Sequence, residues 1–145
     1  MDHYTKDNFA SLQNVGYAIN KSRNLLVGEM DSALKDLDIS TQQMGVMLAV
    51  QRGIATTPFE LSKYLGTDTG LMTRLLDKLE TKGLLERSRS LEDRRVVNLT
   101  LTEKGNAVAD QIPGIAPGVL NRRLKRFTKE EFKQLNYLLG KFLEA

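Results

Sequence analysis

The sequence predicts a mostly α-helical, α+β protein that carries one small β-hairpin. Three observations lead to this prediction. Apolar residues recur at helical spacing over most of the chain, including both ends. Residues 84–101 instead hold two short segments with alternating apolar residues, separated by a polar stretch. The length of 145 residues suits one domain with its own core, and no repeat or flexible linker divides the sequence.

The segment 58–101 organises the rest of the chain, and we expect a helix, a turn at Gly66, a second helix from Thr69 to Lys82, and a hairpin. In the second helix the apolar residues form one stripe: Leu71, Met72, Leu75, Leu76 and Leu79. The opposite face is polar and narrow: Gly70, Thr73, Arg74, Asp77, Lys78 and Thr81. Such a face fits the DNA major groove, where an arginine can pair with a guanine edge. The solvated face of an ordinary amphipathic helix has the same pattern.

The hairpin makes the first interpretation stronger. Gly83 ends the second helix, Leu84 to Arg87 form a first strand, and Val96 to Leu101 form a second. The turn region is rich in arginine, and the hairpin arginines are Arg87, Arg89, Arg94 and Arg95. Only Glu92 and Asp93 oppose them. A helix-turn-helix followed by an arginine-tipped hairpin is a winged helix, whose second helix enters the major groove while the hairpin reaches the minor groove.

The helices outside this segment carry their own start and stop signals. We expect a first helix over residues 7–37, with apolar positions that include Leu12, and a second from Ser40 to Arg52. Capping boxes are predicted where a serine or threonine precedes a glutamine or glutamate by three: Ser40 and Gln43, Thr57 and Glu60, Thr128 and Glu131. Residues 54–56 are expected to add a very short strand, and Thr102 to cap a fifth helix. Pro113 and Pro117 predict a break near residues 112–118.

With these segments in order, the chain resembles the MarR family of bacterial transcription regulators. The matching segments are Ser40-Thr41-Gln42, Glu60-Leu61, Thr73 to Glu80 with Gly83-Leu84, Asp93-Arg94-Arg95, and Leu101 to Gly105. The resemblance runs from about residue 10 to residue 143. It implies one domain over 1–145, in which residues 38–101 form the DNA-binding module and residues 1–37 and 102–145 form dimerisation helices.

The resemblance also implies a function. The chain is expected to be a homodimer that binds double-stranded DNA at a near-palindromic operator, most often as a repressor, and that a small aromatic or phenolic effector releases. Thr73 and Arg74 are the expected main contacts of the recognition helix, with Gly70, Asp77 and Lys78 as secondary ones. In the wing, Arg95 is expected in the minor groove, held by Asp93, while Arg94 contacts the backbone.

Two further groups of residues are weaker candidates. The helix starts at Ser40, Thr57 and Thr69 offer free backbone N–H groups to phosphates, although each fits an ordinary cap equally well. Tyr17, Met44 and Met47 are candidates for lining an effector pocket, with plain core packing as the favoured alternative. The basic run 121–126 is expected to be a solvated surface of the dimer arm, and DNA contact is its alternative.

Composition excludes several other classes of function. The chain has no cysteine and one histidine, His3, so we expect no thiol chemistry, no metal site, no cofactor and no catalytic residues. No apolar run is long enough for a membrane span and no signal peptide is recognisable, which makes the cytoplasm the expected location. The remaining rival is a winged helix that binds another protein instead of DNA, and the arginines of the hairpin argue against it.

Overall fold

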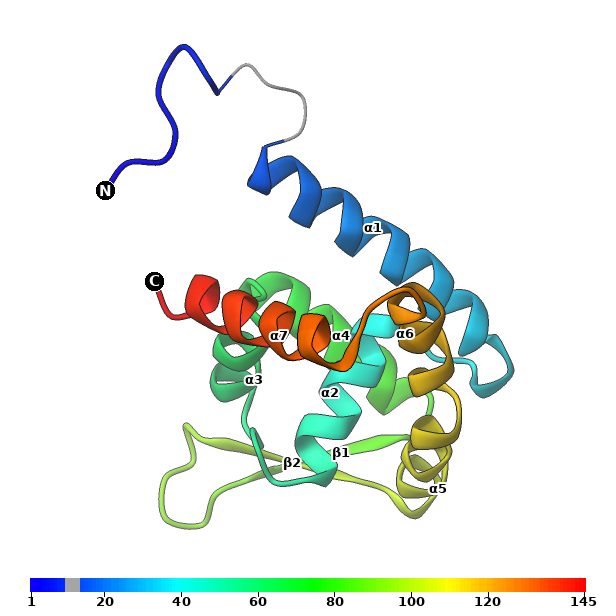
Figure 1. The fold of residues 1–145 in the computed structure, drawn as a ribbon. Coiled ribbons are helices and arrows are strands. Elements are labelled where there is room, and N and C mark those ends of the chain that lie inside the picture. Colours follow the sequence, from blue (N-terminus) through cyan, green and yellow to red (C-terminus); the bar gives the residue numbers. More distant parts are fainter. Residues whose placement is uncertain (10–13) are drawn as a thin grey trace.

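The computed structural model describes residues 1–9 and 14–145, and Figure 1 shows its arrangement of helices around one small sheet. In the described residues the elements follow in this order: α1 (Val15–Ala33), η1 (Lys35–Leu37), α2 (Thr41–Gln51), α3 (Pro58–Leu65), α4 (Thr69–Thr81), β1 (Leu85–Arg89), β2 (Val97–Leu101), α5 (Glu103–Gln111), η2 (Ile112–Gly114), α6 (Ala116–Leu124) and α7 (Lys129–Leu143). The elements labelled η are single turns of 3₁₀ helix. The predicted mostly helical fold with one hairpin is confirmed.

The first helix is shorter than the predicted span of 7–37. It starts at Val15, because the side chain of Asn14 accepts the backbone N–H of Tyr17, and asparagine is among the best N-cap residues. Residues 6–9 form a turn instead, which Thr5 and Asn8 close with reciprocal hydrogen bonds. Leu12 and its neighbours in 10–13 lie outside the described residues. At the other end α1 stops at Ala33, and the chain continues as η1.

The predicted caps of the next helices hold with one exception. Ser40 and Gln43 form a complete capping box on α2. Thr57 accepts the backbone N–H of Glu60 at 3.2 Å, but the expected return bond is missing: the Glu60 carboxylate accepts the Thr57 hydroxyl, not the Thr57 backbone N–H. This box is therefore only half formed. Gly66, at φ 65°, gives the tight turn before α4.

The hairpin pairs β1 and β2 in antiparallel register, with Leu85 opposite Leu101 and Arg89 opposite Val97. The first strand runs from Leu85 to Arg89, two residues further toward the turn than predicted, whereas the second begins one residue later than predicted, at Val97. Beyond the strands, the backbone N–H of Ser90 donates to the carbonyl of Val96 at 2.9 Å. Residues 54–56 do not form the predicted short strand in the described sheet. They are connected to it by a backbone hydrogen bond, in which the N–H of Leu99 donates to the carbonyl of Thr56 at 2.8 Å.

The C-terminal region breaks where the two prolines predicted. Helix α5 gives way to η2 at Ile112, and α6 begins again at Ala116. On its outer side α6 joins α1 through a bidentate ion pair: Arg123 donates to the Glu29 carboxylate at 2.6 and 3.1 Å. The hydrogen bonds and charge of this guanidinium hold the pKa of Glu29 below its usual range.

One buried cluster joins residues from Met30 to Val119, and it draws side chains from most elements of the chain. The terminal helices contribute little to it. Met30 is the only buried residue of α1, and α7 has none. The N-terminal half of α1 projects beyond the other helices in Figure 1. Apolar side chains on both terminal helices are therefore left on the surface of the chain.

A tight backbone contact fixes the hairpin to α5. The Thr102 hydroxyl donates to the carbonyl of Gly83 at 2.6 Å, and its oxygen accepts the N–H of Gly105 as the cap of α5. Gly105 then lies so close to Leu84 that an added Cβ would be 2.0 Å from the Leu84 carbonyl oxygen. Only glycine fits here.

We predict that Gly105→Ala destabilises the protein by about 2–4 kcal/mol, because the new methyl group must displace backbone rather than a flexible side chain. Urea unfolding followed by circular dichroism measures the change. Gly118→Ala is the matched control, since a Cβ there meets nothing within 4 Å. Equal stability of the two variants would contradict the close approach.

Candidate nucleic-acid interface

Helix α4 presents the predicted polar face because its apolar stripe is buried. Met72, Leu75, Leu76 and Leu79 are buried in the cluster. At the helix start, Asp68 accepts the backbone N–H of Leu71 at 2.7 Å and so acts as the N-cap. The residues of the opposite face are all exposed: Thr69, Gly70, Thr73, Arg74, Asp77 and Lys78. The helix is thus anchored along one side and open along the other.

Two details shape that open face. The Thr73 hydroxyl donates to the carbonyl of Thr69 at 2.9 Å, which fixes the orientation of this side chain on the helix. The Arg74 guanidinium lies toward the start of the helix, because a Cβ built on Gly70 would be 3.6 Å from Arg74 Nη1 and 3.3 Å from Asp68 Oδ1. A side chain at position 70 would crowd the Asp68 cap and contact the arginine. Gly70 therefore leaves room for this arrangement.

The wing holds the side chain of Arg95 by local hydrogen bonds. Asp93 accepts from Arg95 three times: from the backbone N–H at 3.0 Å, from Nε at 3.0 Å and from Nη2 at 3.1 Å. The Ser90 hydroxyl oxygen accepts the backbone N–H groups of Glu92 and Asp93, and Arg89 donates to the Arg94 carbonyl at 2.8 Å. The side chain of Arg95 is nevertheless 90% exposed. The turn thus presents a guanidinium to solvent in a fixed orientation.

The electrostatics of the turn agree with this geometry. The side-chain hydrogen bonds from Arg95, and then its backbone N–H, hold the pKa of the Asp93 carboxyl below its usual value of 3.8. Asp93 therefore stays ionised at neutral pH, and the ion pair persists there.

Two predicted contact residues, Asp77 and Arg87, bind each other. Arg87 of β1 donates to Asp77 Oδ1 at 2.7 Å, and its Nε lies 3.5 Å from Glu80 Oε2. Both acids belong to α4, so the guanidinium connects the first strand of the wing to the recognition helix. This contact was not visible in the sequence, although the spacing of three between Asp77 and Glu80 puts both on one helix face.

The weaker candidates lie in different surroundings. At the start of α2 the N–H groups of Ser40, Thr41 and Gln43 already donate to protein oxygens. At the start of α3 Pro58 has no N–H, and Thr57 accepts from Glu60. Met47 is fully buried and Met44 packs against the same cluster, whereas Tyr17 lies exposed on α1, with the ammonium of Lys21 5.7 Å from its ring centre. The chain by itself does not bring these three residues together.

An open groove of about 660 Å³ lies between the end of α1, η1 and the start of α2 on one side and α4 on the other. It is lined by Arg74 and Lys78 of the recognition helix and by residues that the sequence did not single out as a group, among them Asp38, Gln43 and Lys82. In the described chain no helix is long and apolar enough to cross a membrane. The same residues hold no cluster of histidine and acidic side chains suited to a metal ion.

We predict that Arg95→Ala raises the pKa of Asp93 toward 3.8, with part of the depression surviving because the backbone N–H of residue 95 still donates to the carboxylate. A pH titration of the side-chain carboxyl carbons by NMR measures it. Arg94→Ala, which removes a neighbouring guanidinium that has no bond to Asp93 in the described structure, should leave the value low. A low pKa in both variants would contradict the bidentate pair.

Comparison with known proteins places this geometry in a family. The model of the MarR family matches residues 39–97. The chain is 35% identical over 128 residues to the multiple antibiotic resistance protein MarR of Escherichia coli strain K12, a match that covers 88% of this chain and 87% of that protein.

Solved structures agree. A cysteine-to-serine mutant of E. coli MarR complexed with operator DNA is 33% identical to this chain, with a TM-score of 0.84 over 95% of this chain and 99% of that one. A second structure of the same mutant, not described as a DNA complex, has a TM-score of 0.72 at 33% identity, over 90% and 97%. This chain therefore belongs to the MarR family of transcription regulators, with their winged-helix fold.

Proposed function

We propose that this protein is a dimeric, sequence-specific DNA-binding regulator of transcription, and most simply a repressor that binds a near-palindromic operator. The observation that carries the proposal is the pair of exposed elements described above. The polar face of α4 has the width and residue types of a major-groove reader, and the wing beside it presents a preoriented guanidinium. The related E. coli protein is a MarR with the same fold, solved on its operator DNA.

The placement of the residues supports the following proposed roles. Arg74 and Thr73 contact bases and phosphates in the major groove, with Thr69, Gly70 and Lys78 close to the backbone. Arg95 enters the minor groove while Asp93 holds it, and Arg89 and Arg94 contact phosphates. Asp77 and Arg87 support these contacts through their mutual ion pair, which fixes the wing to the recognition helix. Of the helix starts at Ser40 and Thr57, the one at Thr57 is the better candidate for a phosphate contact, since N–H groups at the start of α2 already donate to protein oxygens.

A second copy of the chain is the proposed partner of the terminal helices. Helix α7 carries a stripe of exposed large apolar side chains, among them Leu138, Phe142 and Leu143, the last 83% exposed. Helix α1 exposes Val15, Tyr17 and Leu25 in the same way. Soluble monomers seldom leave apolar patches of this extent uncovered. Residues 1–37 and 102–145 would then form the dimer arms, and residues 38–101 the DNA-binding module of one domain.

Two-fold symmetry sets the geometry of DNA binding. It places two recognition helices about 34 Å apart, one turn of DNA, and so selects an operator with two half-sites. A small effector, aromatic or phenolic, that alters this separation would release the protein. Tyr17, Met44 and Met47 remain our proposal for residues near such an effector, with Tyr17 brought close by the dimer. We propose no catalytic role. Because the proposed partner is chromosomal DNA, we propose that the protein acts in the cytoplasm.

The first prediction concerns the protein's own upstream DNA, because regulators of this kind commonly control a neighbouring promoter. A gel shift across a salt series should show a specific complex of one dimer that random duplex DNA does not compete away. Affinity should fall steeply with salt, since lysine and arginine contacts to phosphates release counterions. If the protein binds neither its upstream DNA nor duplexes selected from a random pool more strongly than random DNA, the protein-interaction role is favoured instead.

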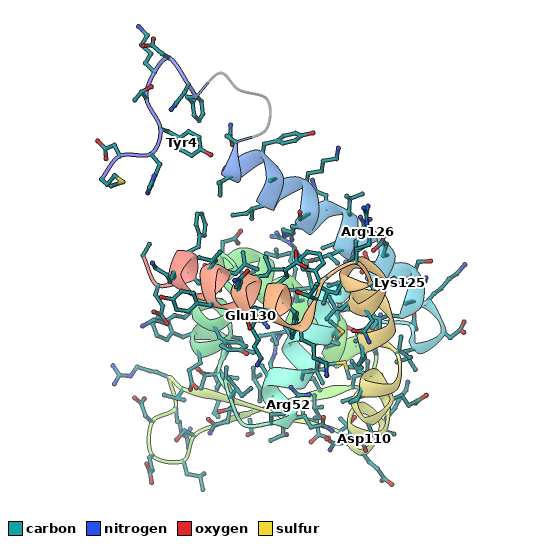
Figure 2. The ribbon with its side chains drawn as sticks, in the orientation of Figure 1. Tyr4, Arg52, Asp110, Lys125, Arg126 and Glu130 are labelled. Carbon is teal, nitrogen blue, oxygen red and sulfur yellow. The ribbon has the colours of Figure 1, made fainter. Side chains whose placement is uncertain are left out.

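The second prediction concerns Arg95→Ala, which should weaken operator binding about tenfold or more while leaving the unfolding midpoint unchanged. The side chain is exposed, and within the described residues its hydrogen bonds are made to Asp93. Fluorescence anisotropy with labelled operator measures it. Arg126→Ala removes the same charge two residues beyond the end of α6, at the upper right of Figure 2 and away from the wing at the lower left, and should bind normally. An equal loss in both variants would mean that net charge, not the wing, accounts for binding.

A further inference from the structure

The junction between the dimer arm and the DNA-binding module is held by a lysine of the recognition helix. Lys82 follows α4 as its C-terminal cap residue. Its Nζ donates to the backbone carbonyl of Asp38 and to Gln43 Oε1 at 3.3 Å, and it lies 3.9 Å from the Asp38 carboxylate. Asp38 is the residue that connects η1 to the start of α2. One side chain therefore spans from the end of the recognition helix to the point where the arm meets the module.

The backbone at this junction has an uncommon conformation. Asp38 has φ 55° and ψ 40°, and it is the only residue other than glycine with positive φ in the described chain. This conformation costs an aspartate about 1–2 kcal/mol relative to a right-handed one. It also points the Asp38 carbonyl toward Lys82, which accounts for the bond. The lysine thus stabilises the conformation that turns the chain from arm into module.

The second acceptor of Lys82 is itself fixed. Gln43 is 5% exposed, and it is the one buried polar residue in the described structure. Its Oε1 also accepts the backbone N–H of Ser40 at 3.0 Å, as part of the capping box of α2. On the arm side, Asp31 of α1 accepts the backbone N–H and the hydroxyl of Thr41, each at 2.7 Å. The polar groups around Lys82 are therefore preorganised on both sides of the junction.

We propose that Lys82 is a positioning residue for DNA binding: through Asp38 and Gln43 it sets the angle between the dimer arm and the recognition helix. The inference rests on the proposed function and adds to it a residue that acts without touching DNA. The side chain of Lys82 is only 30% exposed, and two acceptors and a carboxylate occupy its ammonium. It is thus poorly placed for a phosphate contact and well placed to hold the junction.

The dimensions make such an angle important. Helix α1 has 19 residues and so is about 28 Å long, which means that a rotation of about 10° at the junction moves its far end by about 5 Å. One base-pair step of DNA is about 3.4 Å along the axis. A small change at Asp38 therefore shifts the separation of two recognition helices by more than one base pair. Two structures of the mutant E. coli relative, one of them complexed with operator DNA, superpose on this chain with different TM-scores, 0.84 and 0.72.

The test compares Lys82→Met with the wild type and with Lys35→Met. Methionine keeps the length of the side chain without its donors. Lys35 lines the same groove, so its replacement removes the same charge without removing a bond of the junction. Because the chain contains no cysteine, Lys63→Cys in each background gives one spin label per protomer on exposed α3. Double electron–electron resonance then measures the distance between the two labels in the dimer. Fluorescence anisotropy measures binding to the operator and to operators with one base pair added or removed between the half-sites.

We expect Lys82→Met to shift or broaden the label separation and to bind the operator about tenfold more weakly, the loss expected for a hydrogen-bonded charge. Its preference for the natural half-site spacing should also fall at least threefold, while Lys35→Met matches the wild type. An unchanged separation or spacing preference overturns the proposal, as does an equal change in Lys35→Met. Urea unfolding verifies that each variant is folded. A wild-type chain without a dimer or a specific DNA complex overturns the proposed function itself, and the inference with it.

Discussion

The burial of one stripe of α4 is the constraint on which the rest of the structure depends. Met72, Leu75, Leu76 and Leu79 contact the common core, and this contact fixes how the helix is rotated about its own axis. Each such side chain contributes about 1.5–3 kcal/mol on burial, far more than any single polar contact on the open face. This rotation directs Thr73, Arg74 and Lys78 toward the outside of the molecule. The buried side of α4 thus determines which residues lie on the surface proposed to recognise DNA.

Polar contacts then connect this helix to its neighbours at its C-terminal end and along its side. At its C-terminal end Lys104 donates to the carbonyl of Lys82 at 3.1 Å, and Lys82 itself reaches the junction before α2. Along its side Arg87 links it to the wing. None of these pairs is deeply buried, and exposed pairs add little stability individually. Their effect is geometric, because they restrict how the wing, the recognition helix and the arm move relative to one another.

The sequence predicted the parts of the structure that depend on local chemistry. Ser40, Thr102 and Thr128 cap the helices where their hydrogen-bonding side chains predicted, and Pro113 with Pro117 breaks the C-terminal region as expected. The pairing of Asp93 with Arg95 also follows from residues two apart. The predicted start of the first helix at residue 7 was wrong. The helical spacing of apolar residues extends through residues 7–14, but the helix begins only after Asn14, which caps it. Contacts between distant residues could not be predicted: Gln43 and Lys82, for example, are 39 residues apart in the sequence, and no local signal connects them.

The lack of buried residues in α7 has a consequence for folding. An isolated helix of 15 residues is only marginally stable in water, and this one receives little stabilisation from its own chain. In the proposed dimer its free energy of folding comes from the second copy, so that folding and association are one equilibrium. The melting temperature would then rise with protein concentration by mass action. Dilution, as in a cell that holds few copies, would loosen the terminal helices before the winged module loses its core.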